Sequence, residues 1–167
     1  MAKKELLLDF SEYDLNHVVA DAEAIRRFNP QRFEMEQLSG ICFEDPVRGV
    51  CVGYKNIGQD EFWVRGHMPG MPLMPGVIMC EAAAQLSSYY IHRFKLMEGV
   101  VGFGALEDVH FRGVVRPGDQ FVIICKLLKL RRSLMTCKFQ CFVNQNLVCE
   151  GKLTGVSIPP EQITGAL

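Results

Sequence analysis

One histidine and one glutamate stand out among the residues of this chain that could carry out chemistry. His67 lies in a loop rich in glycine and proline at residues 66–76, and Glu81 follows on an otherwise apolar segment. A histidine can act as a base near neutral pH, and a carboxyl group among alkyl side chains can stay protonated and act as an acid. The pair therefore indicates proton transfer at carbon in an apolar pocket.

Both residues also have a simpler interpretation. A loop histidine often only hydrogen-bonds to its own backbone, but prolines stiffen this loop, which favours a held catalytic group: Pro69, Pro72 and Pro75. Glu81 could lie at a solvated helix edge, but its neighbours are apolar, so we expect it to be protonated, paired or lining a cavity. Gln85 lies one helical turn further and could hold the carboxyl group in place.

Residues 75–94 must position the glutamate. Their length and three successive alanines predict a helix, and a proline is tolerated in its first turn. The segment is apolar nearly all round through its first half, so we expect a buried helix. Amides at the start of a helix can polarise an oxygen atom placed between them.

Strand-like segments lie on both sides of this helix. Those before it are residues 41–43, 50–52 and 62–64, and those after it are residues 100–111, 121–130, 134–143 and 147–158. The connections at residues 131–133 and 144–146 are short enough for antiparallel hairpins. A buried helix among antiparallel strands predicts an α+β domain.

The first part of the chain differs in composition from the rest. We expect residues 1–40 to form a polar lead-in and residues 41–167 to form the main domain. Asn16 is a candidate N-cap for a short helix at residues 17–28, which Asn29 and Pro30 would end.

Composition excludes several classes of protein. A net charge of −1 over 167 residues argues against a nucleic-acid binder, and no apolar run is long enough to span a bilayer. The start of the chain does not read as a signal peptide. The seven cysteines form no CxxC pair, so we expect small core residues in a reducing cytoplasm rather than disulfides or a metal site.

Three blocks of the sequence resemble the 3-hydroxyacyl-[acyl-carrier-protein] dehydratases of type II fatty acid synthesis. The most specific block contains Gly66-His67-Met68-Pro69-Gly70, Met74-Pro75-Gly76-Val77, Glu81-Ala82 and Gln85. Residues 111–120 are similar to a strand and turn of that family ending in Pro-Gly-Asp, and residues 147–151 also fit. The resemblance implies a hot-dog fold, in which an antiparallel β-sheet wraps around a central buried helix.

The resemblance also implies roles for individual residues. His67 would be the catalytic histidine, Glu81 the catalytic acid, Gln85 the support of that acid, and the Gly76 amide would point at the thioester oxygen. In having a glutamate at position 81, the chain resembles the branch of the family that dehydrates its substrate without isomerising the double bond. Gln31 stands where a histidine is common in the family.

The resemblance further implies the partners and the reaction. The substrate would be a 3-hydroxyacyl chain on acyl carrier protein, converted to a trans-2-enoyl thioester without a metal or other cofactor. The chain would form a homodimer, with a trimer of dimers as a larger assembly, and each site would take its histidine from one subunit and its acid from the other.

Two other functions are compatible with the same fold. In a hot-dog acyl thioesterase the acid would activate water for attack on the thioester carbonyl, and His67 would be dispensable. A non-catalytic acyl-binding regulatory protein would keep the pocket but would be expected to lack one of the two key residues, and this chain has both.

Overall fold

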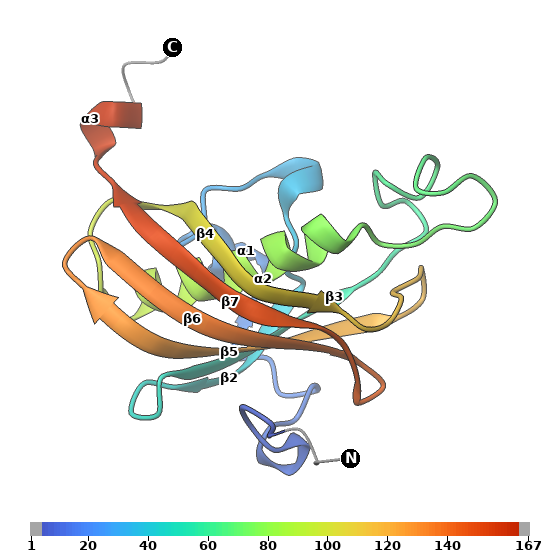
Figure 1. Cartoon of the computed structure of the whole chain (residues 1–167), viewed down its shortest axis with the longest axis horizontal. Coiled ribbons are helices and arrows are strands. Elements are labelled where there is room, and N and C mark those ends of the chain that lie inside the picture. The colour runs from blue at the N-terminus through green and yellow to red at the C-terminus, as the bar shows by residue number, and fades with distance from the viewer. Residues whose placement is uncertain (1–4, 164–167) are drawn as a thin grey trace.

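The computed structural model describes residues 5–163 and contains a seven-stranded antiparallel sheet (Figure 1). The spatial order of its strands is β1-β2-β3-β5-β6-β7-β4. The strands are β1 (Ala20–Asp21), β2 (Gly40–Asp45), β3 (Val50–Asn56), β4 (Val100–Phe111), β5 (Gln120–Arg131), β6 (Leu134–Val143) and β7 (Asn146–Ile158). The α-helices are α1 (Ala22–Arg26), α2 (Gly76–Arg93) and α3 (Pro160–Ile163), and short 3-10 helices span η1 (Phe10–Glu12) and η2 (Phe33–Met35).

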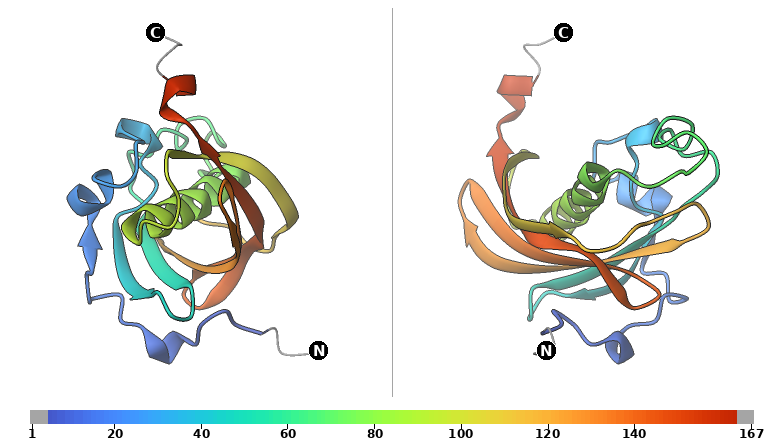
Figure 2. Two further views of the ribbon diagram at one scale, coloured as in Figure 1. Left: turned by 90° about the vertical axis from the view of Figure 1, so that its left-hand side faces the viewer. Right: turned by 45° about the vertical axis from the view of Figure 1, so that its right-hand side comes forward.

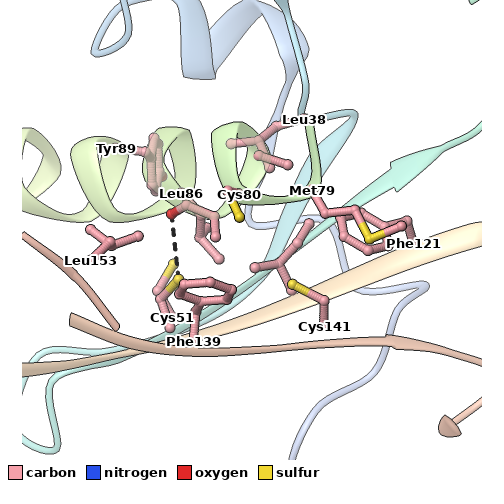
Figure 3. Packing of buried hydrophobic residues seen from close by; sticks show 14 of the residues in the cluster. Leu38, Cys51, Met79, Cys80, Leu86, Tyr89, Phe121, Phe139, Cys141 and Leu153 are labelled. Atoms are coloured by element: carbon pink, nitrogen blue, oxygen red, sulfur yellow. Dashed lines mark hydrogen bonds between the residues drawn. The ribbon is translucent and has the colours of Figure 1, made fainter. Parts of the chain in front are cut away.

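The long helix α2 lies in the hollow of the curved sheet (Figure 2). Eleven of its eighteen residues are buried, as expected for a helix that is apolar on most sides. Leu86 and Tyr89 of α2 pack in one cluster with Phe121, Phe139 and Leu153 of the sheet (Figure 3). The predicted α+β class, with an antiparallel sheet wrapped around a central buried helix, is confirmed.

The four strands that follow α2 agree with the sequence patterns to within one residue at each end. In β6 the alternation places Met135, Cys137, Phe139 and Cys141 in the core, because successive side chains of a strand point to opposite faces. Both predicted hairpins join antiparallel neighbours, β5 with β6 and β6 with β7. Strand β4 pairs with β7 and therefore closes one edge of the sheet.

The outer face of the sheet has a second apolar cluster, which the start of the chain covers. Residues 5–15 run across the side of the sheet that faces away from α2 (Figures 1 and 2). Leu8 is buried there against Val52, Ile124 and Phe142. Gln140 ties this segment down, since its amide accepts from Leu7 N at 2.9 Å and donates to the Glu5 carbonyl at 3.0 Å. The composition of the lead-in gave no sign of this packing.

The predicted helix at residues 17–28 is wrong in its start. Ala20 pairs with Ile41 as part of β1, so the chain stays extended up to Asp21. Asp21 then caps α1, its Oδ1 accepting from Ala24 N at 2.8 Å. Asn16 instead lies in a turn, where its main-chain N–H donates to Asp14 Oδ1.

The predicted strand at residues 62–64 is also wrong. This segment forms successive turns, with the Trp63 carbonyl accepting from His67 N at 2.7 Å and from Gly66 N at 3.2 Å. Trp63 itself is buried in the core, so its apolar character reflects a side chain buried from a turn and does not mark a strand. Such short runs do not separate strand from turn.

All seven cysteines are free and buried, in agreement with their interpretation as small core residues. Burial raises the pKa of the Cys42 thiol to about 12 and that of Cys137 to about 11. At neutral pH these two thiols are therefore protonated and poorly reactive.

Candidate active site

Glu81 lies on the wall of a cavity of about 220 Å³ between α2 and the inner face of the sheet. From α2 the cavity is lined by Glu81, Ala84 and Ser88, and from the connection that precedes η2 by Gln31. The strands contribute Val101, Gly102, Phe103, Met135, Leu153, Thr154 and Gly155. Glu81 is half-buried and shares the cavity wall with both apolar and polar side chains.

Gln85 holds the carboxyl group of Glu81 in one orientation. Its Nε2 donates to Glu81 Oε1 at 2.8 Å and to the Met35 carbonyl at 2.7 Å, while its Oε1 accepts from Gln37 N at 2.9 Å. A main-chain carbonyl can only accept and a main-chain N–H can only donate, so these two partners fix which end of the amide is nitrogen. Glu81 Oε1 is therefore always an acceptor, and a proton on this carboxyl resides on Oε2.

The segment between α1 and β2 supplies these partners and is itself tightly held. Asn29 Nδ2 donates to the Gln85 carbonyl at 2.9 Å. Arg26 binds Glu36 with two hydrogen bonds, of 2.7 and 2.8 Å. These hydrogen bonds lower the pKa of Glu36, so the pair stays charged at neutral pH.

The loop that carries His67 is braced by contacts with its own backbone. The His67 carbonyl accepts from Leu73 N at 2.8 Å, and the ring Nδ1 lies 2.8 Å from the Leu73 carbonyl. Because that oxygen can only accept, Nδ1 carries the hydrogen, and in the neutral ring Nε2 is the nitrogen with a free lone pair. The backbone contact expected of an ordinary loop histidine is thus present, and it also leaves Nε2 able to act as a base.

Gly76 is the first residue of α2, directly after Pro75. Within the described part of the chain its amide has no acceptor, as is usual in the first turn of a helix. A Cβ atom at this position would lie 2.7 Å from the ring of Phe111, so a larger residue would push that ring away from the helix start.

The structure brings some of the predicted site residues together and leaves others apart. Glu81 and Gln85 meet through a direct hydrogen bond. His67 is exposed on the loop before α2 and does not line the cavity that contains Glu81. In Figure 1 this loop extends beyond the start of α2, away from the hollow of the sheet.

Sequence reasoning missed the residues that orient Gln85. These residues lie about fifty positions earlier in the chain and are Asn29, Met35 and Gln37. Met35 and Gln37 act through main-chain atoms, which every residue type has, so their identity in the sequence does not indicate the contact. Only the resemblance drew attention to Gln31 itself.

Neither a metal centre nor a membrane helix is found in the part of the chain that the structure describes. Among residues 5–163, no group of three or more histidine, cysteine or acidic side chains is placed to hold a metal ion. Across the same residues, no helix is both long and apolar enough to cross a membrane.

The chain belongs to the FabA-like family, whose domain model matches residues 29–152. It is similar to the 3-hydroxyacyl-[acyl-carrier-protein] dehydratase FabZ of Lactiplantibacillus plantarum, with 32% identity over 81% of this chain and 92% of that protein. The dehydratase FabZ of Lawsonia intracellularis is 40% identical over 60% of this chain and 69% of that protein.

A solved structure supports the fold independently. The dehydratase heterocomplex ApeI:P from Xenorhabdus doucetiae superposes with a TM-score of 0.71, covering 84% of this chain and 95% of that chain at 12% identity. At this identity the likeness concerns the fold alone, and it agrees with the hot-dog architecture inferred from the sequence.

Proposed function

We propose that this protein is a dehydratase that removes water from 3-hydroxyacyl thioesters to give trans-2-enoyl thioesters in fatty acid synthesis. The observation that carries the proposal is Glu81, a carboxyl group oriented by Gln85 in the wall of a cavity between α2 and the sheet. Membership of the FabA-like family and the dehydratase names of the relatives support the same reaction.

The first step is removal of a proton from the carbon next to the thioester carbonyl. Nε2 of neutral His67 accepts this proton, and its tautomer suits the task because Nδ1 is engaged with Leu73. Negative charge then develops on the thioester oxygen. The Gly76 amide at the start of α2 donates to that oxygen, and one such donor contributes about 3 kcal/mol to stabilising the transition state.

The second step expels the 3-hydroxyl group. Glu81 transfers the proton on Oε2 to the hydroxyl oxygen, the bond between that oxygen and C3 breaks, and water leaves. The electrons of the former C–H bond form the new double bond. Glu81 is now a carboxylate, and the hydrogen bond from Gln85 Nε2 to Oε1 becomes charge-assisted and stronger.

The site requires two subunits, since His67 does not reach the cavity of its own chain. Strand β4 is the sheet edge that favours this assembly. None of its residues is buried, and Phe103, Leu106 and Phe111 are 46%, 45% and 53% exposed.

An exposed edge strand of twelve residues is a template for pairing with another chain. Because β4 also lines the cavity, a second copy paired along it would stand beside Glu81. Trimers of such dimers are the proposed larger assembly.

The natural substrate is proposed to be carried by acyl carrier protein, with its acyl chain in the cavity and its phosphopantetheine arm entering from outside. Acyl carrier protein is the carrier printed in the names of the relatives. We place the protein in the cytoplasm, because its seven cysteines are free thiols, as is usual in reducing compartments.

The experiment that tests the proposal is turnover of purified protein with 3-hydroxyacyl thioesters of several chain lengths, on acyl carrier protein and on coenzyme A. We expect an enoyl thioester with the carrier still attached, and loss of turnover in His67→Ala. Release of free carrier thiol, with activity retained in His67→Ala, would instead identify a thioesterase. Binding of acyl thioesters without turnover would identify the non-catalytic acyl-binding protein.

A further inference from the structure

Gln31 presents an unsatisfied acceptor in the wall of the cavity that contains Glu81. Its side chain lines that cavity, and its Oε1 is buried without a hydrogen-bond donor among the described residues. A buried acceptor without a donor destabilises the folded state, because the hydrogen bond to water that it gives up on folding is not replaced. Such groups are uncommon in folded proteins and are often explained by function.

The other neutral polar side chains of the cavity already have partners. Ser88 Oγ lies 3.4 Å from His92 Nδ1, and Thr154 Oγ1 lies 3.5 Å from Thr136 Oγ1. Unlike Ser88 and Thr154, Gln31 therefore has a side-chain oxygen that accepts no hydrogen bond from the described residues.

The position of Gln31 is built into the fold. Arg32 clamps the loop by donating to the main-chain carbonyls of Asn29 at 2.8 Å, Gln31 at 2.7 Å and Arg26 at 3.1 Å. Asn29 in turn holds the Gln85 carbonyl. The same connection therefore places Gln31 and braces the residue that orients the catalytic acid.

We propose that Gln31 Oε1 accepts the hydrogen of the substrate's 3-hydroxyl group and then holds the departing water. This inference rests on the proposed function. The hydroxyl oxygen uses one of its lone pairs to receive the proton from Glu81 Oε2. The hydrogen that the hydroxyl group already carries needs a separate acceptor inside the cavity. When the bond to C3 breaks, the resulting water donates one hydrogen to the Glu81 carboxylate and the other to Gln31. Gln31 thus orients the leaving group toward the acid.

The test compares Gln31→Leu and Gln31→Met with wild type on two ligands of equal chain length. For the 3-hydroxyacyl thioester we expect kcat/KM to fall ~10- to 100-fold, the loss of one or two hydrogen-bond energies. A saturated acyl thioester has no 3-hydroxyl, so its inhibition constant should stay within about 3-fold of wild type. The melting temperature should not fall, because the side chain removed has an unpaired acceptor.

The control is Gln120→Leu, a change at an exposed glutamine that does not line the cavity of Glu81. It should alter neither kcat/KM for the hydroxy substrate nor the inhibition constant of the saturated thioester. Equal losses for both ligands in the Gln31 variants would mean a structural role and overturn the inference. Undiminished kcat/KM for the hydroxy substrate would overturn it as well, while leaving the proposed function intact. A wild-type protein unable to dehydrate any 3-hydroxyacyl thioester would overturn both.

Discussion

Replacing Gln85 by leucine should separate the positioning of Glu81 from its chemistry. The change removes both donors of Nε2 and the acceptor Oε1 at a residue that is 3% exposed. The Met35 carbonyl and the Gln37 N–H then lose their partner, at about 1–3 kcal/mol for each group that stays buried. With partial rearrangement, we expect the free energy of unfolding to fall by about 2–4 kcal/mol.

The effect on catalysis has a different origin. Gln85 donates to a neutral acid in the ground state and to a developing carboxylate in the transition state, so its hydrogen bond strengthens along the reaction. A hydrogen bond contributes about 0.5–1.5 kcal/mol between neutral groups and about 1.5–3 kcal/mol to a charged group. The difference of about 1–1.5 kcal/mol predicts a loss in kcat of roughly 5- to 10-fold with little change in KM.

Two measurements check this reasoning on the same preparation. Urea denaturation gives the stability, and steady-state turnover of a 3-hydroxyacyl thioester below the unfolding transition gives kcat and KM. A stable Gln85→Leu variant with wild-type kcat would refute the assigned role of Gln85. A rise in KM alone would assign it to ground-state binding instead.

Two further outcomes are expected. Glu81→Gln should keep the fold but lose most dehydration, because an amide cannot supply the proton that expels hydroxide, and wild-type-like turnover would move the acid elsewhere. Burial that raises the pKa of Cys42 to about 12 and of Cys137 to about 11 should leave both thiols protonated and slow to react with a thiol reagent in native protein at pH 8; fast labelling of either would contradict the described core.

Much of the central architecture could be predicted because it depends on periodic patterns. The helix that carries Glu81 is marked by its length and alanines, and β6 by strict alternation. The contact between Glu81 and Gln85 follows from a spacing of four residues on one helix, which geometry fixes without tertiary information.

What could not be predicted depends on contacts between distant parts of the chain. The predicted start of the helix at residue 17 is wrong because Ala20 pairs with Ile41 in the sheet, and such pairing overrides a local helix signal. The packing of Leu8 on the outer face and the isolated acceptor of Gln31 are also products of tertiary structure. Neither has a signature in spacing or composition.

The most direct test of the shared active site is a mixture of two inactive variants, His67→Ala and Glu81→Gln. If the histidine of one subunit serves the glutamate of the other, a dimer with one chain of each kind contains one intact site. Random re-association of equal amounts should therefore restore about a quarter of the wild-type activity, although each variant alone is inactive. A mixture that forms mixed dimers yet stays inactive would contradict a site built from His67 and Glu81 of different subunits.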